Sequence, residues 1–437
     1  MTEQAKHQIV IVGGGAGGLE LATALGNKLG KKNKADITLI DRSRTHVWKP
    51  LLHEVAAGTF DSHENELEYL AQSSNNYFRF RLGSMQGLNR ERKEVYVAPT
   101  FNEEGEEVVP ARTFCYDTLV IAVGSVSNDF GIEGVKENSF FLDTTQQAEK
   151  FQKRLMEAYL RAHTHKHINK PGELDVVIAG GGATGIELAA QLHKVSFLLA
   201  AYGLDEITPS DIKLTIIEAA DRILPGLPPR LSASAHQELS ALKIDVLTNE
   251  RIVSITPEGV NTESGRFIPC FIKVWAAGIK APNFLKDLDG LETNHINQLV
   301  VRPTLQTTLD DDIFAIGDCA ACVWPGKNTN VPPRAQSAHQ QASLVASSIR
   351  NRLKGDPIAD FVYKDYGSLV SLGEYSTVGN LMGNLTGTIL IEGYFARLVY
   401  LSLYKMHQLA LYGPFRTFML SLSHLFRKSV HPEIKLH

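Results

Sequence analysis

Two stretches of this 437-residue chain have nearly the same sequence: "IVIVGGGAGGLELATAL" at Ile9–Leu25 and "VVIAGGGATGIELAAQL" at Val176–Leu192. Each begins with a short apolar run, which predicts a strand buried on both faces, and then meets a glycine cluster where the chain must turn. In the pattern G-x-G-x-x-G the first glycine permits a tight turn, the second lets a pyrophosphate approach, and the third lets helix pack on strand. The glycines in this pattern are Gly13, Gly15, Gly18, Gly180, Gly182 and Gly185. The repeat therefore predicts two dinucleotide-binding units of the α/β class.

The strand that follows each glycine motif ends near an acidic residue. Asp41 lies 23 residues after Gly18, whereas Glu218 lies 33 residues after Gly185, which indicates an insertion in the second unit around "AYGLDEITPS". A carboxylate at this place hydrogen-bonds the ribose hydroxyl pair and repels a 2′-phosphate. Both units are therefore expected to bind non-phosphorylated adenine dinucleotides, one bringing electrons and the other receiving them.

The composition agrees with a multidomain α/β protein. A chain of this length allows two or three domains, because domains run to about 100–200 residues. The formal net charge of −4 gives no nucleic-acid signature. Four cysteines and the lack of a signal-peptide pattern at the start favour a reducing, cytosolic environment.

Two apolar stretches flank the second glycine motif and are expected to carry the chain across between the units. They are "YDTLVIAVGS" (Tyr116–Ser125) and "FIKVWAAGIKAP" (Phe271–Pro282). Further along, "IFAIGDCA" places Asp318 after an apolar strand and a glycine, where its carboxylate can approach a bound cofactor. On spacing alone, an aspartate there is more often an ordinary turn residue or helix cap.

Taken together, these motifs resemble the two-dinucleotide-binding-domain flavoproteins, and within them the type II NADH dehydrogenases. That family comprises single-subunit NADH:quinone oxidoreductases of bacterial respiratory chains that do not pump protons. The resemblance covers essentially the whole chain. The matching segments are "GGGAGGLE", "HVWKPLLHEVA", "YDTLVIAVGS", "GGGATGIE", "WAAGIKAP", "IFAIGDCA", "PPRAQSAHQQA" and the basic, apolar C-terminal region.

The resemblance implies two Rossmann-like domains and a C-terminal amphipathic helical region that binds a membrane. Non-covalent FAD would be held by a discontinuous domain, residues 1–120 and 286–393, and NADH by an inserted domain, residues 121–285. The first glycine motif, Asp41 and Asp318 would hold FAD, with Lys49 in the segment beside the flavin. The second glycine motif and Glu218 would hold NADH.

Three further residues acquire roles through the resemblance. Glu187 would lie near the flavin and nicotinamide and assist proton movement; the alternative is a first-turn glutamate favoured by the helix dipole, as at the equivalent Glu20. "RAQSAHQQA" matches the family's quinone motif, so Gln336 and Gln340, four apart on one helix face, would contact the quinone. Taken without the resemblance, this run is a polar helix face.

A quinone acceptor requires contact with a membrane. The segment 394–437 carries a net charge of +5 against −9 for the rest, and its apolar residues indicate two amphipathic helices separated at Gly413 and Pro414. Neither reaches the roughly 18–20 apolar residues that span a bilayer. We therefore expect a peripheral protein on the cytoplasmic face of the bacterial inner membrane, and the resemblance also implies a possible homodimer. The alternative is ordinary core or dimer-interface helices.

Two other functions remain open from the residues. Cys319 and Cys322 form C-x-x-C, which suits a disulfide reductase or two metal ligands, although no second cysteine pair completes a metal site and none is predicted. A protein that binds flavin and NADH as a sensor, with little turnover, needs both glycine motifs but not the glutamine motif.

Overall fold

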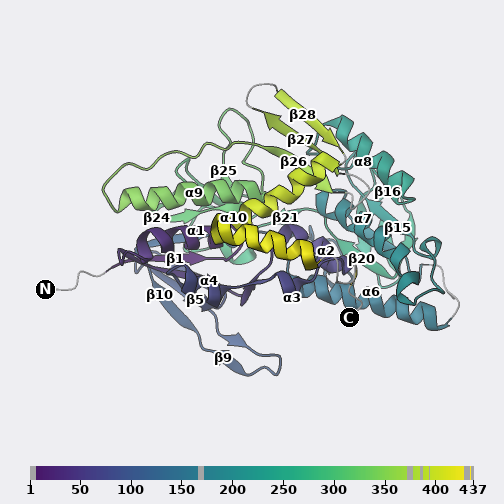
Figure 1. The fold of residues 1–437 in the computed structure, drawn as a ribbon, viewed down its shortest axis with the longest axis horizontal. Helices are drawn as coiled ribbons and strands as arrows, with labels where there is room; N and C mark the ends of the chain where they lie inside the picture. The colour runs from purple at the N-terminus through teal and green to yellow at the C-terminus, as the bar shows by residue number, and fades with distance from the viewer. Residues whose placement is uncertain are drawn as a thin grey trace.

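In a computed structural model the chain forms two large sheets that lie side by side (Figure 1), one mixed and one entirely parallel. The structure describes residues 6–165, 172–371, 377–383, 387–392, 394–427 and 434. The larger sheet has eight strands in the order β25-β22-β23-β24-β11-β1-β2-β5. Its strands come from both ends of the chain: β1 (His7–Val12), β2 (Ala35–Asp41), β5 (Arg79–Leu82), β11 (Thr118–Ile121), β22 (Leu299–Val301), β23 (Gln306–Thr307), β24 (Asp310–Ala315) and β25 (Ala320–Cys322). This sheet therefore joins strands that precede the second sheet in the chain with strands that follow it.

The second sheet is built entirely from the middle of the chain. Its order is β13-β20-β14-β15-β16, and every neighbouring pair is parallel. The strands are β13 (Phe140–Phe141), β14 (Val176–Ala179), β15 (Leu214–Ile217), β16 (Asp245–Leu247) and β20 (Ile272–Trp275). The predicted α/β class with two dinucleotide-binding folds is confirmed.

The chain crosses between the sheets twice, and the two crossings pair with each other. β12 (Val126–Ser127) and β21 (Ile279–Lys280) form a two-stranded antiparallel sheet. β21 lies in the second of the two apolar stretches that predicted crossovers, and β12 directly follows the first, which ends at Ser125.

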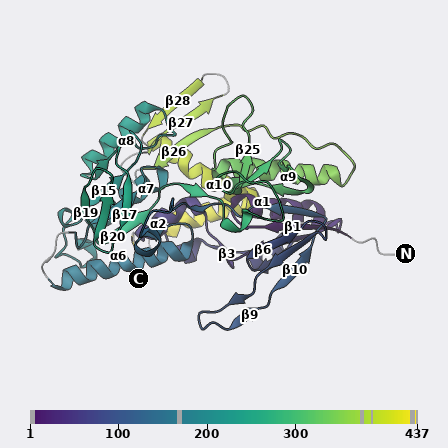
Figure 2. The same ribbon diagram turned by 180° about the vertical axis from the view of Figure 1, so that it is seen from behind.

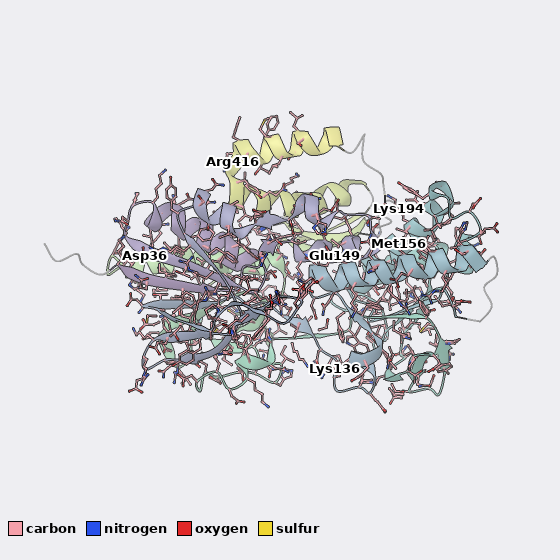
Figure 3. All side chains as sticks on the ribbon, turned by 90° about the horizontal axis from the view of Figure 1, so that it is seen from below. Asp36, Lys136, Glu149, Met156, Lys194 and Arg416 are labelled. Atoms are coloured by element: carbon pink, nitrogen blue, oxygen red, sulfur yellow. The ribbon has the colours of Figure 1, made fainter. Side chains whose placement is uncertain are left out.

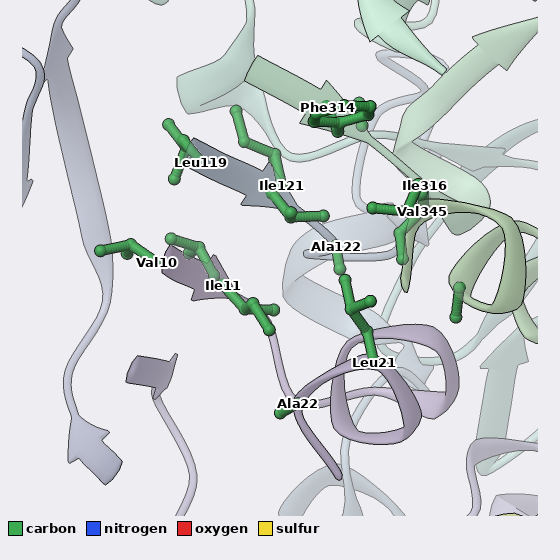
Figure 4. Close-up of a cluster of buried hydrophobic side chains, with 14 of the residues drawn as sticks. Val10, Ile11, Leu21, Ala22, Leu119, Ile121, Ala122, Phe314, Ile316 and Val345 are labelled. Atoms are coloured by element: carbon green, nitrogen blue, oxygen red, sulfur yellow. The ribbon is translucent and has the colours of Figure 1, made fainter. Parts of the chain in front are cut away.

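Helices cover the faces of both sheets, as parallel sheets buried on two sides require. α1 (Ala16–Leu25) packs against α9 (Ala335–Arg352) on the larger sheet, and α2 (Leu52–Ala57) packs against α6 (Thr145–His165) and α7 (Ala183–Leu198). Figure 4 shows the first core, where side chains of β1, β11, β24, α1 and α9 meet. Further helices are α3 (Ser62–Asn65), α4 (Tyr69–Asn75), α5 (Val135–Asn138) and α8 (Pro229–Ala241).

Smaller antiparallel sheets lie around the two large sheets and their helices, and one hairpin projects from the body of the molecule (Figures 1 and 2). The hairpin is β8 (Thr100–Phe101) with β9 (Glu107–Val109). The others are β3 (Thr45–His46) with β4 (Leu67–Glu68), β6 (Met85–Asn89) with β7 (Glu94–Val97) and β10 (Arg112–Cys115), β17 (Ile252–Ile255) with β18 (Gly259–Thr262) and β19 (Phe267–Pro269), and β26 (Gly367–Ser371) with β27 (Thr377–Gly383) and β28 (Gly387–Glu392).

The C-terminal helix α10 (Tyr394–Arg427) is broken where the sequence predicts it. Gly413 has φ 74° and ψ 173°, which interrupts the helix, and Pro414 follows. The part after the break, marked by Arg416 in Figure 3, lies on the outside of the molecule. Among the described residues, no helix is both long and apolar enough to cross a bilayer. Lys428, Glu433 and Lys435 lie outside the described residues.

Candidate active site

The two glycine turns have the same geometry. Gly13 has φ +102° and Gly180 φ +107°, a conformation that side chains other than glycine rarely adopt, and in each case a Cβ would collide with the backbone of the adjacent strand's end. At Gly18 and Gly185 a Cβ would lie 1.8 and 2.1 Å from the carbonyl oxygen of the first glycine. In contrast, nothing lies within 4 Å of a Cβ built on the middle glycines, Gly15 and Gly182. The space that a pyrophosphate needs is therefore open in both turns.

Each turn is also held by the acid of the following strand. Asp41 Oδ2 accepts a hydrogen bond of 2.6 Å from Gly14 N, and Glu218 Oε2 accepts one of 2.7 Å from Gly181 N. Burial raises the pKa of Asp41 above its ordinary value, while hydrogen bonds from Gly14 and Ser43 act against that rise. The insertion before Glu218 consists of two short 3₁₀ turns, Ala200–Tyr202 and Pro209–Asp211, so it lengthens the loop without moving the acid from its place.

A cavity of about 2630 Å³ connects these turns. Ligand pockets for single small molecules usually measure about 300–1,000 Å³, so this cavity has room for more than one large ligand. Among the predicted site residues, its lining contains Gly13, Gly15, Asp41, Lys49, Gly182, Glu187, Asp318, Gln336 and Gln340. The other predicted residues, Gly18, Gly180, Gly185 and Glu218, are absent from the lining.

Lys49 and Asp318 meet at Ser125, which the sequence analysis did not single out. Lys49 Nζ donates a hydrogen bond of 2.9 Å to the carbonyl oxygen of Ser125, and Ser125 Oγ donates one of 2.8 Å to Asp318 Oδ2. Asp318 lies in a 3₁₀ turn, Gly317–Cys319, directly after β24. The two distant parts of the first unit therefore close on the same wall of the cavity.

Glu187 lies between the two units, and the alternative explanation for it is wrong. α7 begins at Ala183 and has no acidic residue in its first turn, because Glu187 is already one turn into the helix, beyond the reach of the dipole effect. Its Oε2 lies 3.6 Å from Nδ1 of His53 on α2. His53 is 2% exposed, and burial lowers its pKa to about 4. A neutral imidazole therefore faces the Glu187 carboxylate where the units meet.

Gln336 and Gln340 line the cavity from α9, but both amides also bind a neighbouring segment. Gln336 Nε2 donates to the carbonyl oxygen of Gly367 at 2.9 Å. Gln340 donates to the carbonyl oxygen of Lys364 at 2.8 Å and accepts from the Lys364 amide at 3.0 Å. An amide side chain has two donor hydrogens, so Gln340 retains one for a ligand.

The cysteine pair lacks the surroundings of a redox dithiol. Cys319 and Cys322 are 0% and 2% exposed, and neither lines the cavity. Burial raises the pKa of Cys319 to about 12 and that of Cys322 to about 11. Reactive cysteines have lowered pKa values and access to substrate, so the disulfide-reductase function is not supported.

The fold and this cavity define a class of flavoprotein with two dinucleotide-binding domains. Residues 7–342 match the family model described as pyridine nucleotide-disulphide oxidoreductase, and the chain belongs to that family. Within it the chain belongs to the type II NADH:quinone oxidoreductases. It is 44% identical to the Type II NADH:quinone oxidoreductase of Haemophilus influenzae over 98% of this chain and 99% of that one, and 28% identical to NdhA of Mycobacterium tuberculosis over 92% and 83%.

Solved structures agree on the fold. NDH2 from Plasmodium falciparum in complex with NADH superposes with a TM-score of 0.81 at 20% identity, covering 99% of this chain and 100% of that chain. The sulfide:quinone oxidoreductase from Aquifex aeolicus has a TM-score of 0.73 at 21% identity, covering 98% and 96%.

Proposed function

We propose that this chain oxidises NADH and passes two electrons to a membrane quinone through bound FAD, without pumping protons. The observation that carries this function is the single cavity in which two dinucleotide turns and the glutamine-bearing helix α9 meet. FAD supplies the redox chemistry, since it can take a hydride and release electrons. The protein positions the reactants and excludes water.

FAD fits the first unit. The open space at Gly15 and the N-terminus of α1 suit a pyrophosphate, and Asp41 suits the adenosine ribose. Asp318, held by Ser125, and Lys49 lie farther along the same cavity. We assign residues 1–120 and 286–393 to this domain.

NADH fits the second unit, residues 121–285. Gly182 presents the same open space at the N-terminus of α7, and Glu218 occupies the place that selects against a 2′-phosphate. Glu187 and the neutral His53 lie between this turn and the first unit, where a nicotinamide would meet the flavin. This placement supports a role for Glu187 in proton movement.

The quinone is assigned to the part of the cavity lined by Gln336 and Gln340. Amides donate to a quinone carbonyl without competing for its protons. Since both side chains also hold residues 364–367, they would shape the quinone site as well as contact it.

We further propose that α10 lies on a lipid surface. Phe415 and Phe418 are 76% and 64% exposed, and Met406 and Leu409 are 46% and 47% exposed. Apolar faces with basic neighbours such as Arg416 suit an interfacial helix on anionic lipid. A position at the cytoplasmic face of the bacterial inner membrane follows from the use of NADH there, and a homodimer stays a prediction.

Paired acceptors test the quinone site. In a Gln336→Ala, Gln340→Ala variant, NADH oxidation by ferricyanide should persist while turnover with a short-chain quinone falls by about 100-fold, the effect of several lost substrate contacts. Gln237→Ala, an exposed glutamine on α8, is the matched control and should change neither activity. Unchanged quinone turnover in the double variant would place the acceptor elsewhere. If the parent protein binds FAD and NADH but turns over with neither acceptor, the alternative function as a flavin- and NADH-binding sensor is favoured.

A further inference from the structure

A buried carboxylate on α1 joins the glutamine-bearing helix to the C-terminal helix. Glu20 is 6% exposed. Its Oε2 lies 2.5 Å from Nδ1 of His339 on α9, and its Oε1 lies 2.6 Å from Nδ1 of His407 on α10. His407 is 3% exposed, so this contact is buried. Three helices that are distant in sequence therefore meet at one carboxylate.

The hydrogen-bond pattern fixes where protons lie. His46 Nδ1 is 3.0 Å from the carbonyl oxygen of Gly14, which can only accept, so this nitrogen must be the donor. Burial lowers the pKa of His46 to about 3, so its ring is neutral and its Nε2 accepts a hydrogen bond from His407 Nε2, 3.0 Å away. His407 therefore uses one N–H toward His46 while its other nitrogen faces Glu20. The pair of His407 and Glu20 must hold one proton between them.

The other end of this chain of groups opens into the cavity. His339 lies between Gln336 and Gln340 on α9, is 35% exposed at its side chain, and lines the cavity with both glutamines. The hydrogen bond to Glu20 raises the pKa of His339, although burial opposes this. On the inner side, Trp48 packs on His407 with ring centroids 4.3 Å apart, which keeps α10 in place.

We propose that Glu20 and His407 are positioning residues for quinone reduction. They hold a proton beside His339, in the part of the cavity that Gln336 and Gln340 line. Because His407 belongs to α10, this supply of protons depends on the packing of α10 in its place. The proposal rests on the proposed function. It gives the C-terminal helix a second role besides lipid contact, because the residue that completes the proton-holding pair comes from α10.

The proton balance of the reaction requires such a source. NADH, one proton and quinone give NAD⁺ and quinol, so a hydride supplies two electrons and one proton, and the second proton comes from solvent. In the proposed step an N–H bond of protonated His339 breaks as an O–H bond forms on the quinone. Solvent then restores the proton to the cluster through the exposed part of His339.

Within the part of the chain that the structure describes, few charged or titratable groups face Glu20. They are His339 from α9 and His407 from α10, with His46 of β3 behind His407. Although burial opposes it, the hydrogen bonds of His339 and His407 hold the pKa of Glu20 below its ordinary value. Glu20 is therefore ionised at neutral pH, and its hydrogen bond raises the pKa of His339. Removal of the Glu20 charge should let His339 lose its proton at lower pH.

A pH profile with two acceptors tests this. The full-length, FAD-loaded protein is assayed from roughly pH 6 to pH 9, the range in which histidine titrates, with a short-chain quinone and with ferricyanide, which takes electrons without protons. In Glu20→Gln, kcat with quinone at neutral pH should fall about tenfold or more, as for loss of general acid catalysis. The alkaline limb of the pH profile of kcat with quinone should move by about one pH unit to lower pH. Ferricyanide turnover and flavin content should stay at parent levels.

Glu149→Gln is the matched control. Glu149 also accepts a short hydrogen bond, from Ser62 Oγ at 2.6 Å, and lies 3.8 Å from His63, but it is absent from the cavity lining. Its quinone profile should match that of the parent. If Glu20→Gln does not fold, His407→Gln makes the same test from α10 and should also shift the alkaline limb.

The outcomes separate the two claims. A parent-like quinone profile in a folded Glu20→Gln protein overturns the inference and leaves the proposed function intact. An equal fall with both acceptors and no change of profile also overturns it, because that result indicates structural damage alone. If the parent protein shows no turnover with quinone, the proposed function itself is contradicted.

Discussion

Ser125 Oγ donates a hydrogen bond of 2.8 Å to Asp318 Oδ2, although 193 positions separate the two residues. Ser125 lies just beyond the first segment, where the chain crosses to the second unit, and Asp318 belongs to the returning segment, so this bond ties the returning segment to the start of the crossing beside the cavity. Asp318→Ala should weaken FAD binding by about tenfold or more, since hydrogen bonds to charged groups contribute about 1.5–3 kcal/mol. Flavin content after gel filtration measures this. Asp311→Asn, whose side chain is 73% exposed, should retain the parent's flavin, and full flavin content in Asp318→Ala would contradict the assignment.

Glu218 should control the choice between NADH and NADPH. Glu218→Gln removes the charge that repels a 2′-phosphate, so the ratio of kcat/KM for NADH over NADPH should fall about tenfold or more, chiefly through a lower KM for NADPH. Asp245→Asn, on a neighbouring strand of the same sheet, should leave the ratio unchanged. If the ratio is the same in Glu218→Gln, the adenosine ribose does not lie at this residue.

The exposed phenylalanines of α10 should govern lipid binding. Phe415→Ser with Phe418→Ser should lower partition to anionic vesicles by about tenfold or more, because a buried apolar side chain contributes about 1.5–3 kcal/mol. Vesicle flotation measures the partition, and deletion of the chain after Gly393 should abolish it. The control is Phe267→Ser, a phenylalanine that is 50% exposed on β19. Equal flotation of parent and deletion variant would show that α10 is not the anchor.

The two buried cysteines should be dispensable for turnover. Cys319→Ala with Cys322→Ala removes both thiols from β25 and the turn before it, and NADH:quinone turnover should stay within about twofold of the parent, since a buried free cysteine acts as a small apolar side chain. The midpoint temperature of thermal unfolding should fall only modestly. A loss of turnover in a folded, flavin-loaded variant would restore the redox interpretation of the pair.

The sequence predicted those features that depend on short-range pattern. Gly13 and Gly180 are required by a turn that no other side chain fits well, and Asp41 and Glu218 follow a strand, so their places can be read from the motif. The break at Gly413 is likewise local, because glycine and proline together end a helix. The family resemblance added the cofactors, which no local pattern specifies.

The features that were missed depend on contacts between distant segments. Glu20 was considered only as a first-turn glutamate, yet its role comes from His339 and His407, which lie 319 and 387 positions away. The sequence offers no spacing rule for such a meeting. His339 could have been identified as a candidate site residue from the sequence, because it lies between the two glutamines of the predicted quinone motif. The attachment of Gln336 and Gln340 to residues 364–367 also follows only from the packed structure.

The central claim is that one cavity hosts both half-reactions, and stopped-flow absorbance tests it most directly. The FAD-loaded protein is mixed anaerobically with NADH and then with a short-chain quinone while the flavin band is followed. The account predicts rapid bleaching by NADH and rapid recovery with quinone. Bleaching without recovery on quinone would contradict it and indicate a dehydrogenase with a different acceptor.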